Sequence, residues 1–177
     1  MNKHLKLVRE FYEAESCPQA AYGANARLSE MDIVMQQALL MEEGSELFKA
    51  IKAGDMVEIL AGTVNLAYCA LGAIAIQGAD VLEQPVSWRH DGFVISLMRL
   101  FSDQINHCTS GSPDDYSAVY SLCVHLSRSF INADFDKAFQ RIHDSKMAQL
   151  DKSGVQVEGA RTSKSFKTPD LSEYLYE

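Results

Sequence analysis

The feature that most constrains the fold is the segment from residue 56 to residue 77, in which almost every position is apolar. A helix that is apolar on all sides has to be buried, so other parts of the chain must surround it. Gly62, Thr63 and Asn65 interrupt the apolar run, which favours a buried helix over a membrane span. The segment therefore predicts the central helix of a bundle.

The residues that flank this segment predict where it begins and ends. Gly54 suits the left-handed position after a helix, and Asp55 suits the N-cap of the next one. Gly78 follows the last apolar position. Because so short a turn joins antiparallel helices, we expect the helix before Gly54 to pack directly against the apolar one.

The rest of the chain also follows helical periodicity, and the alternation typical of β-strands is hard to find. We expect one all-α domain over residues 1–177, because this length is that of a single domain. Phe11 and Tyr12 are assigned to its core. The polar residues 151–177 are expected to form an extended C-terminal tail. Six helices are expected. Five of them span residues 3–15, 30–53, 56–77, 92–108 and 136–150, and Ser29 is the expected N-cap of the second. The remaining helix is capped by Ser112 or Asp114 and runs to Phe130.

The net charge, the cysteine spacing and the N-terminal residues exclude several classes of function. The chain has 16 Lys and Arg against 24 Asp and Glu, and its net charge of −8 argues against a broad nucleic-acid or anionic-membrane surface. An acidic chain still binds a polyphosphate when metal ions lie between its carboxylates and the phosphates. The four cysteines lack CxxC spacing, so no zinc knuckle is predicted. No apolar signal region follows the first residues, and we expect a cytoplasmic protein.

An acidic cluster lies within the helix expected over residues 30–53. Glu46 follows Glu43 by three positions and Glu42 by four, which places the three carboxylates on one helix face. Like charges at this spacing repel, and a divalent cation is the simplest group that offsets the repulsion. The alternative is an acidic face in contact with solvent.

A second polar stripe lies on the apolar helix itself. Glu58, Gly62 and Asn65 are separated by four and three positions, so they share one face. In an antiparallel pair this stripe would meet the acidic cluster. A carboxylate cluster between packed helices is the arrangement that holds hard cations in the cores of helical bundles.

The run EEGSELFKAIKAGDMVEILAGTVNLAYCALGAIAIQGAD at residues 42–80 resembles the core of a known family. It is similar to the MazG-like all-α nucleotide pyrophosphohydrolase superfamily, and within it to the phosphoribosyl-ATP pyrophosphohydrolase-like branch, which includes phage-type dNTP pyrophosphohydrolases. The opening VREFYEA and the closing FDKAFQRIHDSKMAQLDKSG and KSFKTPDL are also similar to this branch. About fifty residues between 81 and 132 match it poorly and are interpreted as an elaboration. The positions that match the central pattern are Glu42, Glu43, Glu46, Gly54, Asp55, Glu58, Asn65, Tyr68 and Gly72.

The resemblance implies metal-dependent cleavage of a (d)NTP into a (d)NMP and pyrophosphate, in a MazG-like bundle that forms a homodimer or homotetramer. Purine deoxynucleotides, dGTP or dATP, are slightly favoured as substrates over dUTP or dCTP. Mg²⁺ or Mn²⁺ would be the cofactor. The resemblance also implies roles for single residues. The metal ligands would be Glu43, Glu46, Glu58 and Asn65. The catalytic pair would be Glu42 and Glu43, with Glu42 binding metal or orienting the water, and the substrate-binding residues would be Lys146, Lys164, Lys167 and Tyr68.

The chain departs from this pattern at several positions. The family's acidic ExxD motif reads Gly62-Thr-Val-Asn65, and Ala61 stands where the branch often has Asp. In the closing block, Ser145-Lys-Met-Ala-Gln149 replaces Ser-Asn-Met-x-Lys, so Lys146 would supply the cation that Gln149 lacks. His143 in the same block is interpreted as a structural hydrogen-bonding residue. These departures leave an alternative open: a degenerate nucleotide-binding regulatory or interaction protein without turnover.

Overall fold

The computed structural model describes residues 1–89, 91–153 and 167–176. These residues form six α-helices and no named β-strand, which confirms the all-α fold. Each expected helix is present, with ends within three residues of the predicted ones. The helices are α1 (Lys3–Ala14), α2 (Glu30–Ala53), α3 (Met56–Gln77), α4 (Val94–His107), α5 (Pro113–Ser129) and α6 (Phe135–Ser153), with short 3-10 turns at Cys108–Ser110 and Ser172–Tyr174.

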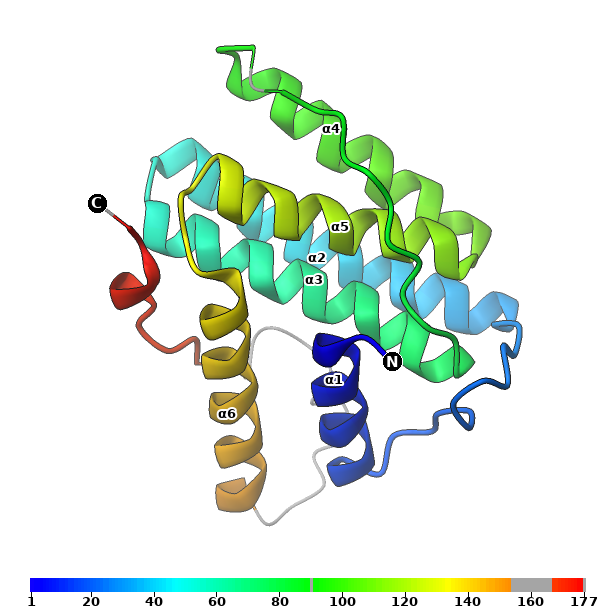
Figure 1. Cartoon of the computed structure of the whole chain (residues 1–177). Helices are drawn as coiled ribbons and strands as arrows, with labels where there is room; N and C mark the ends of the chain where they lie inside the picture. The colour runs from blue at the N-terminus through cyan, green and yellow to red at the C-terminus, as the bar shows by residue number, and fades with distance from the viewer. Residues whose placement is uncertain (90, 154–166, 177) are drawn as a thin grey trace.

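The predicted central helix is α3, which α2 and α5 flank in one layer while α1 and α6 pack across it (Figure 1). Most of its side chains are buried, including Leu60, Leu71 and Ile74 with no exposed surface. By length and composition α3 is the single described helix that could cross a membrane. However, 83% of its most apolar window is buried inside the protein, as expected for the centre of a bundle.

The predicted helix ends are confirmed by their caps. The Ser29 side chain accepts a hydrogen bond from the backbone N–H of Asp32, and the Asp32 carboxylate accepts one from the backbone N–H of Ser29, so the two residues form a capping box. Gly54 has a φ of 72°, which only glycine adopts without strain, and ends α2. Asp55 then caps α3 through the backbone N–H groups of Val57 and Glu58.

Two glycines of α3 permit close helix packing and so determine how neighbouring helices align. A Cβ atom on Gly62 would lie 3.0 Å from the Leu47 Cα, so the backbones of α2 and α3 nearly touch there. A Cβ on Gly72 would lie 2.9 Å from the Tyr12 Cζ, because the ring of Tyr12 on α1 covers this glycine. The assignment of Phe11 and Tyr12 to the core is confirmed, since both are buried.

The segment interpreted as an elaboration, residues 81–132, is in part a central element of the fold. Helix α5 lies along α3 as closely as α2 does, and it buries Tyr116, Val119 and Cys123 completely. Periodicity alone predicts that α5 is a helix, but only its packing shows that the core needs it. Helix α4 lies outside this layer and contacts α2 and α5.

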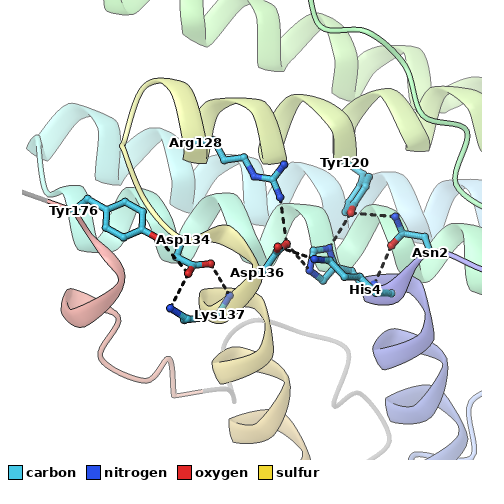
Figure 2. Close-up of polar contacts among 9 residues, drawn as sticks. Asn2, His4, Tyr120, Arg128, Asp134, Asp136, Lys137 and Tyr176 are labelled. Carbon is cyan, nitrogen blue, oxygen red and sulfur yellow. Dashed lines mark hydrogen bonds and ion pairs between the residues drawn. The ribbon is translucent and has the colours of Figure 1, made fainter.

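The C-terminal tail is only partly extended. Helix α6 continues to Ser153, and residues 167–176 return to the corner between α5 and α6. There Leu171 is fully buried, and the backbone N–H of Asp134 donates to the Tyr174 carbonyl over 2.9 Å. The Tyr176 hydroxyl donates to the Asp134 carboxylate over 3.1 Å (Figure 2). Lys164 lies outside the described residues, and the exposed Lys167 lies at the start of this packed segment.

Candidate functional site

Three of the predicted site residues interact: Lys146 lies over the Tyr68 ring, and its charge is attracted by that of Glu43. Glu43 comes from α2, Tyr68 from α3 and Lys146 from the middle of α6, while Phe11 of α1 completes the aromatic surface. The Lys146 Nζ lies 5.1 Å from the centroid of the Tyr68 ring and 5.9 Å from that of Phe11. An ammonium at such distances over aromatic faces is attracted by their electron density.

Glu43 and Lys146 carry opposite charges, and burial shifts the pKa of each of them. Burial raises the pKa of Glu43, and the nearby ammonium of Lys146 counteracts this, whereas Glu42 and Glu46 add to the rise. Burial lowers the pKa of Lys146, and Glu43 is the strongest of the groups that counteract it, ahead of Cys69 and Glu15. The charge of each group thus offsets part of the effect that burial has on the pKa of the other.

A histidine that sequence reasoning treated as structural lies directly beside this site. The Tyr68 hydroxyl and the His143 Nδ1 are 3.1 Å apart, and the His143 Nε2 is 4.0 Å from the Glu10 carboxylate. Burial lowers the pKa of His143 and raises that of Tyr68, so the neutral forms of both are favoured. His143 therefore fixes the position of the ring over which the Lys146 ammonium lies. The sequence signal that could have found it is its spacing of three residues from Lys146, on the same face of α6.

Glu46 and Glu58 are not part of this cluster. The Glu46 carboxylate is paired with the Lys49 ammonium at 2.7 Å on the exposed side of α2. Glu58 is exposed in the first turn of α3. Because Leu47 packs on Gly62 in an antiparallel pair, Glu43 lies level with Leu66. Eight residues of helix, about 12 Å, therefore separate the level of Glu43 from Glu58.

The other substrate-binding prediction in the closing segment concerns Lys167. Its backbone carbonyl accepts a hydrogen bond of 3.3 Å from the Gln149 Nε2, and its side chain is exposed. Gln149 also contacts the Ser145 hydroxyl at 3.4 Å. Gln149 thus holds the backbone of Lys167 against α6.

The structure does not bring the four predicted metal ligands, Glu43, Glu46, Glu58 and Asn65, together at one place. Within the described residues, no group of three or more His, Cys, Asp or Glu side chains is placed to hold a metal ion. One atom favours a cation: the Oδ1 of Asn65 is buried and accepts no hydrogen bond from the described residues. Asn65 lies at nearly the same level of the helix pair as Glu43, but Glu46 and Glu58 do not join them.

A second polar cluster links α1, α5 and α6 (Figure 2). The His4 Nδ1 lies 2.8 Å from the Tyr120 hydroxyl, and its Nε2 lies 3.3 Å from the Asp136 carboxylate. Asp136 also pairs with Arg128 at 3.3 Å, and Asn2 donates to the Tyr120 hydroxyl over 3.2 Å. Burial lowers the pKa of His4 to about 4. His4 lies on α1, Tyr120 and Arg128 on α5 and Asp136 on α6, so these contacts hold three helices together.

Comparisons of the chain with protein-family models, with curated proteins and with solved structures find no match.

Proposed function

We propose that the chain is a MazG-like helical protein that binds a nucleoside triphosphate at Lys146 without hydrolysing it. Purine deoxynucleotides, dGTP or dATP, are the favoured ligands, as the sequence resemblance implies. The observation that carries the proposal is the partly buried Lys146 ammonium, which lies over Tyr68 and is attracted by Glu43.

The charge distribution supports a phosphate ligand at this place. The whole chain carries a net charge of −8, so phosphate groups need a local positive charge to approach it. Lys146 supplies that charge in a poorly solvated place, where its attraction for an anion is stronger than at the surface. The side chains of Tyr68 and Phe11 limit where the ammonium lies.

The second candidate is a metal-dependent nucleoside triphosphate pyrophosphohydrolase that uses Mg²⁺ or Mn²⁺. The unpartnered carbonyl oxygen of Asn65 favours it, because amide oxygens are ligands of these hard cations. The neighbouring Glu42 and Glu43 would supply charge on the facing helix. The dispersed positions of Glu46 and Glu58 count against it.

One assay separates the two candidates. The protein is incubated with each NTP and dNTP, with Mg²⁺ or Mn²⁺, and the products are resolved by anion exchange while equilibrium dialysis measures binding. We expect one subset to bind, with purine deoxynucleotides the tightest, and no monophosphate to form. If monophosphate and pyrophosphate appear, the hydrolase is the correct function, and Glu43→Ala and Glu46→Ala should then abolish turnover in folded protein.

We also propose a cytoplasmic homodimer or homotetramer. The exposed face of α2 carries large apolar side chains, with Met31, Val34 and Met41 exposed by 66%, 56% and 61%. Apolar side chains in a row on one helix face are typical of a surface covered by another subunit. Light scattering of the purified protein is expected to give two or four times the mass of one chain, and the mass of a single chain would contradict the oligomer.

A further inference from the structure

The exposed side of α2 carries a row of residues with the spacing of a helix-pairing surface. Its members are separated by alternating steps of three and four positions, so they line one side of the helix. The row consists of Met31, Val34, Ala38, Met41 and Ser45, and we call it the α2 stripe. All of these residues are exposed. The α2 stripe is about 21 Å long and has the pattern of a seam that packs against a second helix.

Neighbouring helices of the same chain contact other sides of α2. Helix α3 packs on the side of Leu47, which nearly touches Gly62. Helix α4 packs on the side of Gln37 and Gly44: the Gln37 Nε2 donates to the Ile105 carbonyl over 2.9 Å, and the Ile105 side chain occupies the space beside Gly44. At about 100° per residue, the α2 stripe lies on the side of the helix opposite Leu47. The packing of α3 and α4 therefore leaves the stripe open.

The α2 stripe fits a second copy of itself that runs in the opposite direction. In the antiparallel register that pairs the most members of the stripe, Ala38 of one copy faces Met41 of the other, and Val34 faces Ser45. Each of these layers places a large side chain against a small one, which lets facing side chains interdigitate without a gap. A two-fold axis repeats every layer, so both copies make the same contacts.

The charges at the two ends of α2 also fit an antiparallel pair. The exposed Glu30 begins the helix, and the exposed Lys49 and Lys52 lie near its end. Antiparallel pairing places Glu30 of each copy beside the lysines of the other, whereas parallel pairing would bring like charges together at both ends. The opposed helix dipoles favour the same direction. Charge complementarity thus selects the antiparallel arrangement.

We propose that the α2 stripe is the subunit interface of this protein and that it pairs with the stripe of a second copy, antiparallel across a two-fold axis. The inference rests on the homodimer or homotetramer of the proposed function, and it names the surface and the geometry on which that oligomer depends. Such a contact closes on itself, so it gives a dimer, and a tetramer needs a second surface. Nucleotide binding is not part of this inference.

The first test uses the wild-type protein and dilute hydrogen peroxide, with methionine sulfoxide followed by peptide mass spectrometry. Met31 and Met41 are exposed by 66% and 61% in the single chain, and Met56, which lies outside the stripe, by 42%. Susceptibility follows exposure, so a covered stripe should make Met31 and Met41 react about fivefold or more slowly than Met56. The oligomeric state is measured by light scattering on the same sample.

The outcomes of this test separate the interface from the oligomer. Slow oxidation of Met31 and Met41 in an oligomer supports the inference. Oxidation of both at least as fast as that of Met56 in an oligomer overturns the inference and leaves the proposed oligomer intact. If the mass is that of a single chain, the oligomer and its interface both fail, while the proposed nucleotide binding is unaffected.

The second test changes the charges that face each other in the antiparallel register. Val34→Glu places a carboxylate in the stripe, and we expect it to give the mass of a single chain. Adding Ser45→Lys to the same chain places an ammonium opposite that carboxylate in the other copy, and the oligomer should return. Within one chain the two positions are about 16 Å apart along α2, so they cannot pair with each other.

The matched control is Ile95→Glu, which adds the same charge at a side chain of α4 that is exposed by 53%. It should leave the mass of the oligomer unchanged. A parallel pair would place like charges together in the double variant and would not recover. Circular dichroism verifies that each variant is folded. Failure of the double variant to recover, in folded protein, would overturn the antiparallel pairing.

Discussion

Gly72→Ala is expected to lower the free energy of unfolding by about 1–3 kcal/mol, because an added methyl group overpacks the contact between α3 and α1. The new Cβ would overlap the hydroxyl of Tyr12 and lie 2.9 Å from its Cζ. Tyr12 is only 8% exposed, so its ring has little room to move. The measurement is urea unfolding with an unchanged m-value, which shows that the native and unfolded states keep their compactness.

The expected sign of this stability change is opposite to the usual effect of a Gly→Ala substitution in a helix. In the middle of a helix, Gly→Ala ordinarily stabilises by about 0.5–1 kcal/mol, because alanine loses less backbone entropy on folding. A double-mutant cycle with Tyr12→Phe provides the control, since removing the hydroxyl relieves part of the overlap. Part of the loss should therefore be recovered in the double variant. A Gly72→Ala protein as stable as the wild type would contradict the packing of Tyr12 on Gly72.

Lowering the pH from 7.5 to 4 is expected to remove about 3 kcal/mol of stability through His4 alone. Burial lowers the pKa of this histidine from 6.5 to about 4. Between these values the unfolded chain binds a proton at His4 and the folded protein does not. Stability from the neutral imidazole is thus fully present above pH 6.5 and is lost as the pH falls through 4. Urea unfolding at closely spaced pH values measures the slope.

The control variant is His4→Gln, which removes the titration and retains polar groups near Tyr120 and Asp136. Its stability should fall less steeply than that of the wild type over the same range. His143 remains in the variant and adds a slope of the same sign, because burial lowers its pKa as well. The difference between the two proteins therefore isolates His4. Identical slopes would show that the His4 cluster does not exclude the proton.

Helix ends and the central helix could be predicted from the sequence because their causes are local. Ser29, Gly54 and Asp55 cap helices through backbone groups two to four residues away, and the buried state of α3 follows from its own apolar composition. The role of α5 could not be predicted this way. Its periodicity indicates a helix, but the residues of the segment do not indicate that this helix packs against α3.

The candidate site shows a second limit of sequence reasoning. Helical spacing correctly groups residues on one face of a helix. It does not show which residues of two neighbouring helices lie side by side along the helix axes. That alignment depends on the contact of Leu47 with Gly62, which separates Glu58 from Glu43 along the helix axis. The attraction between Glu43 and Lys146 joins residues about one hundred positions apart, and only the packing of α6 on α3 creates it.

The burial of most of α3 has a consequence for the motions available to this protein. Exposing the buried side chains of this helix would cost a free energy close to that of unfolding the whole domain, so we expect α3 to be the most rigid helix. Helices α1 and α6 pack across the layer of α2, α3 and α5, where both contact α3 and each other (Figure 1). On the proposal that a nucleotide binds at Lys146, we expect displacements of α1 and α6, rather than of α3, to accompany its entry and release.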